Sequence, residues 1–170
     1  MCTANVCRSP LIARLLRDRL GVPVTSAGSR AEAGRAACPV SSPGVDHAAV
    51  PLEASHVRGA SLVLGAAREH RSAAVALVPS AQAKSFTLLQ AARIATWLAQ
   101  QGVSAPPALS ASEHVGWWVE ELDAARGDAP RGDDDLLDPH EGATRHEVMV
   151  PTLSASVAAL TAVLAPNRFP

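Results

Sequence analysis

The chain has 170 residues, which suits one α/β domain and is short for two. Hydrophobic residues make up 48% and charged residues 18%, so the chain can bury a sizeable core and is not expected to be disordered. The formal net charge of −1 gives no basic excess, so we expect neither nucleic acid nor a membrane surface as a partner.

The cysteine content and the hydropathy of the chain indicate the cellular compartment of the protein. Three cysteines are an odd and sparse set, which fits a reducing cytoplasm better than a disulfide framework. The N-terminal segment carries arginines instead of an apolar signal core, and no apolar run is expected to be long enough to span a bilayer. No Cys/His group has the spacing of a zinc site. We therefore predict a cytoplasmic protein without a metal or other cofactor.

The predicted elements alternate between helices and strands. Residues 1–8 form a loop, and Ser9-Pro10 opens a helix that Gly21 ends. The further elements are a strand at 22–26, a Gly/Pro/Ser-rich stretch at 28–46, a strand at 60–64, a helix at 67–77, a strand at 85–88, helices at 89–100 and 112–125, a loop at 126–135, and a helix at 144–164 interrupted or kinked at Pro151. This alternation predicts a single open, mostly parallel sheet flanked by helices, in one domain over residues 1–170.

The segment CTANVCRS, from Cys2 to Ser9, has the form C-x5-R-S and lies directly before the first predicted helix. A short loop that enters a helix can turn successive backbone N–H groups toward one centre and bind a tetrahedral dianion. Arg8 can add two charge-assisted hydrogen bonds, and Cys2 would lie in line with the phosphorus. The same groups lower the pKa of a thiol from about 8.5, and Ser9 can donate to the thiolate. The plainer interpretation is that Cys2 and Cys7 are buried hydrophobes and Arg8 is a surface residue.

CTANVCRSP resembles the signature loop of the low-molecular-weight protein tyrosine phosphatases, usually written CxGNxCRSP. The similarity continues through residues 24–28, 44–47, 60–71 and 86–93, and the chain is identified as a bacterial-type member of this family. The resemblance implies that a phosphatase-type loop binds phosphate through Thr3, Ala4, Asn5, Val6, Cys7 and Ser9. It also implies that Ser26 and His47 support the loop. Cys7 matches a loop cysteine that can form a disulfide with the nucleophile.

The family places its general acid in an Asp-Pro pair near the C-terminus, and Asp138-Pro139 occupies that place. A phenolate leaves poorly until it is protonated, which a carboxylic acid over the pocket can do. The alternatives are a plain Asp-Pro turn and the three neighbouring aspartates at 133–135. The resemblance thus implies hydrolysis of a phosphotyrosine-containing protein or a small aryl phosphate through a phosphocysteine on Cys2. Oxyanions are expected to inhibit this hydrolysis.

The sequence departs from the family pattern at several places, among them Ala4 in place of the usual Gly and Val50 where many bacterial relatives have an Arg. Family members carry an apolar strand before the nucleophile, whereas here only Met1 precedes Cys2. We therefore expect the first strand to be lacking, and a start assigned too late is the preferred explanation. His140 stands where many members have a Tyr that can stack on the substrate ring, so substrate preference is less determined than reaction type.

Two other functions stay open. A thioredoxin-linked arsenate reductase shares the fold and the loop, but it needs further cysteines downstream, and none follows Cys38. A non-catalytic, N-terminally truncated phosphatase relative would bind anions without turning them over.

Overall fold

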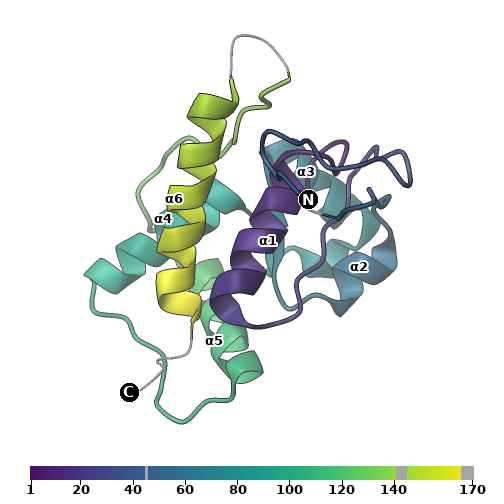
Figure 1. Ribbon diagram of the computed structural model, residues 1–170. Coiled ribbons are helices and arrows are strands. Elements are labelled where there is room, and N and C mark those ends of the chain that lie inside the picture. The colour runs from purple at the N-terminus through teal and green to yellow at the C-terminus, as the bar shows by residue number, and fades with distance from the viewer. Residues whose placement is uncertain (45, 141–144, 166–170) are drawn as a thin grey trace.

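The computed structural model describes residues 1–44, 46–140 and 145–165, and helices surround a small parallel sheet (Figure 1). The elements in chain order are α1 (Arg8–Leu20), α2 (Ala54–Gly59), β1 (Val63–Gly65), α3 (Arg68–Leu77), the 3-10 helix η1 (Pro79–Ala81), β2 (Ser85–Thr87), α4 (Leu88–Gln100), α5 (Ala111–Ala124) and α6 (His146–Leu164). The predicted α/β class, with a parallel sheet flanked by helices, is confirmed.

The sheet is regular only at β1 and β2, which pair in parallel with Leu64 opposite Phe86. Isolated parallel bridges extend the ladder, because Cys2 pairs with Gly28 and Gly28 pairs with Pro51. The start of the chain therefore lies between β1 and the segment around Gly28. This position brings the loop after Cys2 to the carboxyl ends of the parallel strands, where α/β folds place their ligands.

Helix α1 follows the sequence prediction closely. It begins at Arg8, and Gly21 ends it in the left-handed conformation at φ +65°, with its N–H donating to the carbonyl of Arg17 at 3.0 Å. Its apolar side chains Leu11, Ile12 and Leu16 are buried in the core. The helix is thereby fixed at its N-terminal end, where the loop enters.

In the first half of the chain, one predicted strand is wrong, one helix was missed and one strand is shifted. Residues 22–26 do not form a strand, because Pro23 lacks a backbone donor and the segment borders a cavity instead of a neighbouring strand. Helix α2 was not predicted at all. Strand β1 begins three residues later than the predicted strand at 60–64 and ends at Gly65.

Helix α6 packs against α4 and α1 in Figure 1 and supplies much of the core. It begins at His146, and the predicted start at Thr144 lies outside the described residues, as does Val45 in the stretch 44–47. The helix continues through Pro151 without interruption. Its buried side chains are at most 1% exposed at Met149, Leu153, Val157, Leu160 and Leu164.

Helix α6 also has the length and composition of a membrane-spanning helix, with 19 residues and a mean hydropathy of 1.6. The expectation that no apolar segment is long enough is therefore wrong for this helix. A third of this helix is buried, with its buried side against α1 and α4, and core helices of soluble proteins can meet the same criteria of length and composition.

Met1 forms a parallel ladder contact with the end of β1. Its ammonium group donates to the carbonyl of Leu64 at 2.5 Å, and its own carbonyl accepts from the N–H of Ala66 at 2.8 Å. Burial lowers the pKa of this ammonium group below its usual value, because a charge is unfavourable there. A cavity of about 890 Å³ adjoins Met1 and is lined by α1, residues 22–27, α2 and β1. The absence of a first strand stays a prediction.

An added strand should fill this cavity. We expect a fusion of five alternating Val and Ile residues before Met1 to stabilise the protein more than a Gly/Ser fusion of equal length. The apolar fusion can bury side chains and replaces the buried ammonium group with an amide. A net gain of about 2 kcal/mol would raise Tm by about 4–8 °C in a chain of this size. Equal Tm values for both fusions would show that the cavity does not accept a strand.

Candidate active site

The loop from Cys2 to Cys7 turns its carbonyl groups outward to the rest of the protein. The carbonyl of Cys2 accepts from Ser29 N at 3.0 Å, that of Thr3 from Arg30 N at 2.9 Å, that of Asn5 from His47 Nε2 at 2.7 Å, that of Val6 from Cys38 N at 2.8 Å, and that of Cys7 from Ser41 Oγ at 3.4 Å. Across the described residues, no protein acceptor pairs with the backbone N–H groups of residues 3–7. Such unpaired N–H groups are what a nest for an anion requires.

Asn5 holds the loop from inside. Its backbone lies in the left-handed region at φ +54°, which Asn tolerates better than most residues, and its side chain is fully buried. The side-chain oxygen accepts from Val50 N at 2.9 Å, and Nδ2 donates to the hydroxyl groups of Ser9 and Ser26, each at 2.9 Å. The two expected supporting residues, Ser26 and His47, therefore both contact Asn5.

Gly28 lets the neighbouring segment approach the loop. A Cβ atom at this position would lie 2.6 Å from the carbonyl oxygen of Thr3 and 2.8 Å from the backbone nitrogen of Asn5. Both are backbone atoms, which cannot move without distorting the loop. Only glycine fits between this segment and the loop.

Cys2 is 3% exposed, and its sulfur lies 3.0 Å from the hydroxyl oxygen of Ser9. Because this oxygen already accepts from Asn5 Nδ2, the hydroxyl hydrogen of Ser9 is free to donate to the sulfur. A donor in this position stabilises a thiolate more than a thiol. The geometry thus provides a partner for a charged Cys2.

Arg8 joins the loop to the segment that carries the Asp-Pro pair. The guanidinium group is almost fully buried, and it donates to the carbonyl of Leu136 at 2.9 Å and forms an ion pair with the Asp138 carboxylate. The other carboxylate oxygen of Asp138 accepts from His140 N at 3.0 Å. Asp138 is thereby held beside the phosphate loop, 130 residues away in sequence from Arg8.

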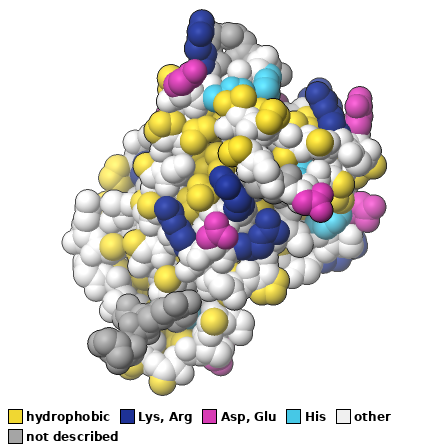
Figure 2. All heavy atoms as spheres, viewed as in Figure 1, with side chains coloured by type: hydrophobic (Ala, Val, Ile, Leu, Met, Phe, Trp, Pro, Cys, Tyr) yellow, Lys and Arg dark blue, Asp and Glu magenta, His cyan; other side chains and the backbone are white. Residues whose placement is uncertain are grey.

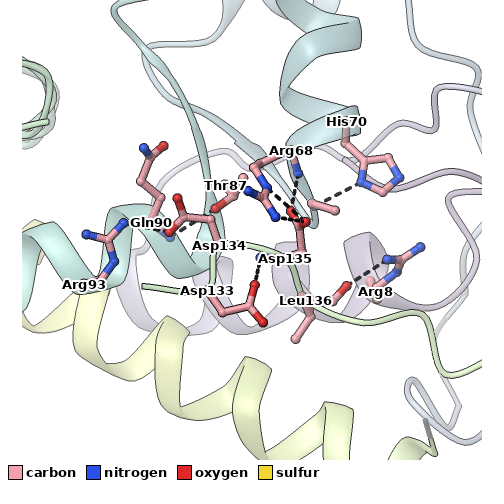
Figure 3. Close-up of polar contacts among 11 residues, drawn as sticks. Arg8, Arg68, His70, Thr87, Gln90, Arg93, Asp133, Asp134, Asp135 and Leu136 are labelled. Carbon is pink, nitrogen blue, oxygen red and sulfur yellow. Dashed lines mark hydrogen bonds and ion pairs between the residues drawn. The ribbon is translucent and has the colours of Figure 1, made fainter. Parts of the chain in front are cut away.

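The three alternative aspartates have other partners, which Figure 3 shows beside Arg8. Asp133 accepts from the N–H of Asp135 at 3.1 Å, Asp134 pairs with Arg93 at 2.7 Å, and Asp135 pairs with Arg68 at 2.8 Å. Hydrogen bonding from Arg68 lowers the pKa of the Asp135 carboxyl, and the backbone N–H of Arg68 also donates to it at 2.7 Å. These contacts fix the segment, and Asp138 is the member of the group that pairs with Arg8.

His70 is a site residue that the sequence analysis missed. The side chain is 1% exposed, and its Nδ1 accepts from Ala67 N at 3.0 Å. The proton therefore lies on Nε2, which donates to the Thr3 hydroxyl at 2.9 Å. Burial, with a smaller contribution from the charge of Arg8, lowers the pKa of His70 to about 4. No local sequence signal distinguishes this histidine from others on helix surfaces.

Cys7 lies beside a second group of side chains. Its sulfur lies 3.5 Å from His146 Nε2, and the sulfur of Cys38 lies 3.3 Å from the same nitrogen. Burial raises the pKa of Cys7 to about 12, so Cys7 remains a thiol at neutral pH and is a slow partner for an oxidised Cys2. Burial opposes ionisation of Cys38 as well, but hydrogen bonds from the Ser41 and Val40 N–H groups lower its pKa overall. The Cys2–Cys7 disulfide stays a prediction.

Known proteins with similar sequences are phosphatases. No protein-family model matches the chain. The low molecular weight protein-tyrosine-phosphatase Etp of Escherichia coli K12 is 36% identical over 131 residues, which cover 71% of this chain and 84% of Etp. The chain belongs to the low-molecular-weight protein-tyrosine-phosphatase family. The predicted family membership is thus confirmed.

A second relative in this family is the protein-arginine-phosphatase of Geobacillus stearothermophilus, 35% identical over 99 residues, which cover 53% of this chain and 67% of that protein. The solved structure of the YwlE arginine phosphatase from the same organism superimposes with a TM-score of 0.62 at 24% identity, over 95% of this chain and 87% of that one. A YwlE mutant from Bacillus subtilis gives 0.60 at 20% identity, over 96% and 92%. Both structures support the fold, and membership of this family supports phosphatase activity.

The lowered pKa of His70 has a consequence for stability. Between pH 6.5 and about 4, the unfolded chain binds a proton at this residue that the folded chain does not bind. Stability should therefore fall as the pH falls through this window, by at most about 1.4 kcal/mol per pH unit from one group. Urea unfolding of the protein and of His70→Gln at several pH values would measure the two slopes. We expect a shallower slope for His70→Gln, and identical slopes would contradict a neutral, buried His70.

Proposed function

We propose that this phosphatase hydrolyses phosphotyrosine and other aryl phosphate monoesters through a phosphocysteine on Cys2. The observation that carries the proposal is the loop itself, whose N–H groups at residues 3–7 have no protein acceptor within the described chain. Preorganised N–H groups stabilise a phosphoryl group during its transfer because they need no reorganisation in the reaction. Cys2 and Arg8 stand at the two ends of this loop.

In the first step, the Cys2 thiolate would attack phosphorus while the bond to the aryl oxygen breaks. Asp138, as the acid, would give its proton to the departing phenolate. In the second step, Asp138 would take a proton from water, the water oxygen would bond to phosphorus, and the sulfur–phosphorus bond would break. Inorganic phosphate leaves, and Ser9 would donate to the sulfur as it regains its negative charge.

The ion pair between Arg8 and Asp138 supports this assignment of roles. A phosphate dianion in the loop would compete with Asp138 for the Arg8 guanidinium, because phosphate accepts two parallel N–H bonds from Arg. The dianion also places negative charge beside the carboxylate, which favours the protonated carboxyl. Substrate binding would thus convert the partner of Arg8 into the proton donor that the first step needs.

One exposed apolar side chain next to Asp138 is compatible with an aryl group. Leu137 directly precedes Asp138 and is 56% exposed. This side chain would offer an apolar contact to a phenyl ring, which gains from burial of its faces.

Phosphoarginine is the second candidate substrate, because the Geobacillus stearothermophilus relative is named as a protein-arginine-phosphatase. The two candidate substrates differ in the group that is attached to phosphorus, whereas the loop would bind the phosphoryl group of either one. We expect higher kcat/KM for a phosphotyrosine peptide than for the same peptide with phosphoarginine, and no turnover of either by Cys2→Ser. Faster hydrolysis of the phosphoarginine peptide would make phosphoarginine the preferred substrate. Activity of Cys2→Ser would show that Cys2 is not the nucleophile.

The general acid can be tested through the leaving group. Asp138→Asn should slow hydrolysis of phenyl phosphate by about 100- to 10,000-fold, but that of p-nitrophenyl phosphate far less, because nitrophenolate departs without a proton. The matched control is Asp133→Asn, an exposed aspartate of the same segment, which should hydrolyse both substrates at wild-type rates. Steady-state kcat for both variants gives the comparison. Equal losses on the two substrates in Asp138→Asn would assign the proton to another group.

A further inference from the structure

Four side chains with metal-binding atoms meet on the outer side of the phosphate loop. They are Cys7, Cys38, His140 and His146, and one sulfur or imidazole nitrogen from each lies within 4.8 Å of all the others. The two cysteines are buried, His146 is half-buried and His140 is exposed. The exposed His140 makes the group reachable from solvent, and Figure 2 shows histidine side chains on the surface of this face of the molecule.

Two of the separations within this group match those of a tetrahedral zinc site. With zinc–sulfur bonds of about 2.3 Å and zinc–nitrogen bonds of about 2.0–2.1 Å, a sulfur and a nitrogen ligand lie about 3.5 Å apart. His146 Nε2 lies 3.5 Å from the sulfur of Cys7 and 3.3 Å from that of Cys38. The rings of His140 and His146 meet edge to face, with centroids 5.0 Å apart. We propose that these four side chains bind one zinc ion.

Each ligand is held by a different part of the fold. Cys7 is the residue before α1, and Cys38 is attached to the loop by the bond from its N–H to the carbonyl of Val6. The hydroxyl of Ser41 lies 3.4 Å from the carbonyls of both cysteines. His146 begins α6, which packs on α1. Cys7, Cys38 and His146 are therefore positioned before any ion arrives, which reduces the cost of binding.

The donor set selects the ion. Two thiolates and two imidazoles in a tetrahedron are a typical zinc set, whereas magnesium and calcium prefer oxygen ligands. A bound zinc ion would replace the thiol protons of Cys7 and Cys38, which are released to solvent. No electron is transferred, and Cys2 takes no part.

The site would tie together segments that surround the anion nest. Cys7 belongs to the loop, and His140 lies two residues after Asp138, whose carboxylate accepts from the His140 N–H. A zinc ion shared by Cys7 and His140 would thus fix the Asp138 segment against the loop. We expect slower amide exchange over residues 136–140 when zinc is bound.

Cobalt binding tests the site directly. The background is Cys2→Ser, which removes the other reactive thiol, and a thiol titration first confirms that Cys7 and Cys38 are reduced. Titration with Co²⁺ should give one ion per chain, with thiolate charge-transfer absorption and the visible bands of tetrahedral cobalt. Zn²⁺ should displace the cobalt and, at about a hundredfold excess over Kd, raise Tm by about 5–10 °C. An octahedral spectrum, or no saturable binding, would overturn the proposal.

Variants then assign the ligands. Cys38→Ser and His146→Gln, each in the Cys2→Ser background, should lose the tetrahedral spectrum and the zinc-dependent rise in Tm. The matched control, His56→Gln, changes a half-buried histidine outside the cluster. This variant should bind cobalt and zinc as the Cys2→Ser protein does. The Tm of each variant without metal shows whether it folds. Unchanged binding in both folded ligand variants would refute the site, and zinc binding without slower exchange at 136–140 would refute the tie to Asp138.

Discussion

The buried side chain of Asn5 bonds at once to Ser9 at the start of α1, to Ser26, and to the backbone N–H of Val50. These bonds hold a left-handed residue in the middle of the loop, and they determine which way the neighbouring peptide groups face. With the carbonyls bonded outward, the N–H groups of residues 3–7 have no protein acceptor within the described chain. In the same network Ser9 accepts one bond from Asn5, and its hydroxyl hydrogen can be donated to the sulfur of Cys2. The shape of the loop and the environment of the thiol therefore depend on one amide.

A second set of contacts brings distant carboxylates to this loop and distinguishes among them. Asp134 and Asp135 each pair with an arginine of a neighbouring helix, and these pairs hold the segment before Leu136 in place. Asp138 then pairs with Arg8, the one ion pair in the described structure that joins this segment to the loop. Asp134 and Asp135 are thus paired with arginines outside the loop, whereas Asp138 is paired with the arginine that, in the proposed function, would bind phosphate.

Much of this candidate site could be predicted from the sequence, because most of its residues lie in short continuous motifs. CTANVCRSP predicts the loop and the helix start, and Asp138-Pro139 predicts the segment that the structure places against Arg8. His70 and the Cys7–Cys38–His140–His146 group could not be predicted, since their members meet only through tertiary packing. The strand expected at 22–26 failed for a related reason, because a strand exists only where a partner pairs with it. Helix α2 is short, and its six residues carry too little periodicity to be detected.

In the proposed reaction, Cys2 takes the phosphoryl group. Mixing the protein with an aryl phosphate, quenching in acid within milliseconds and identifying the phosphorylated peptide by mass spectrometry tests this step most directly. We predict one phosphoryl group per chain on the peptide that contains Cys2, which appears before the steady state and decays as inorganic phosphate forms. A phosphoryl group on Cys7, on Cys38 or on another residue, or rapid turnover with no phosphorylated peptide at any time, would contradict the account.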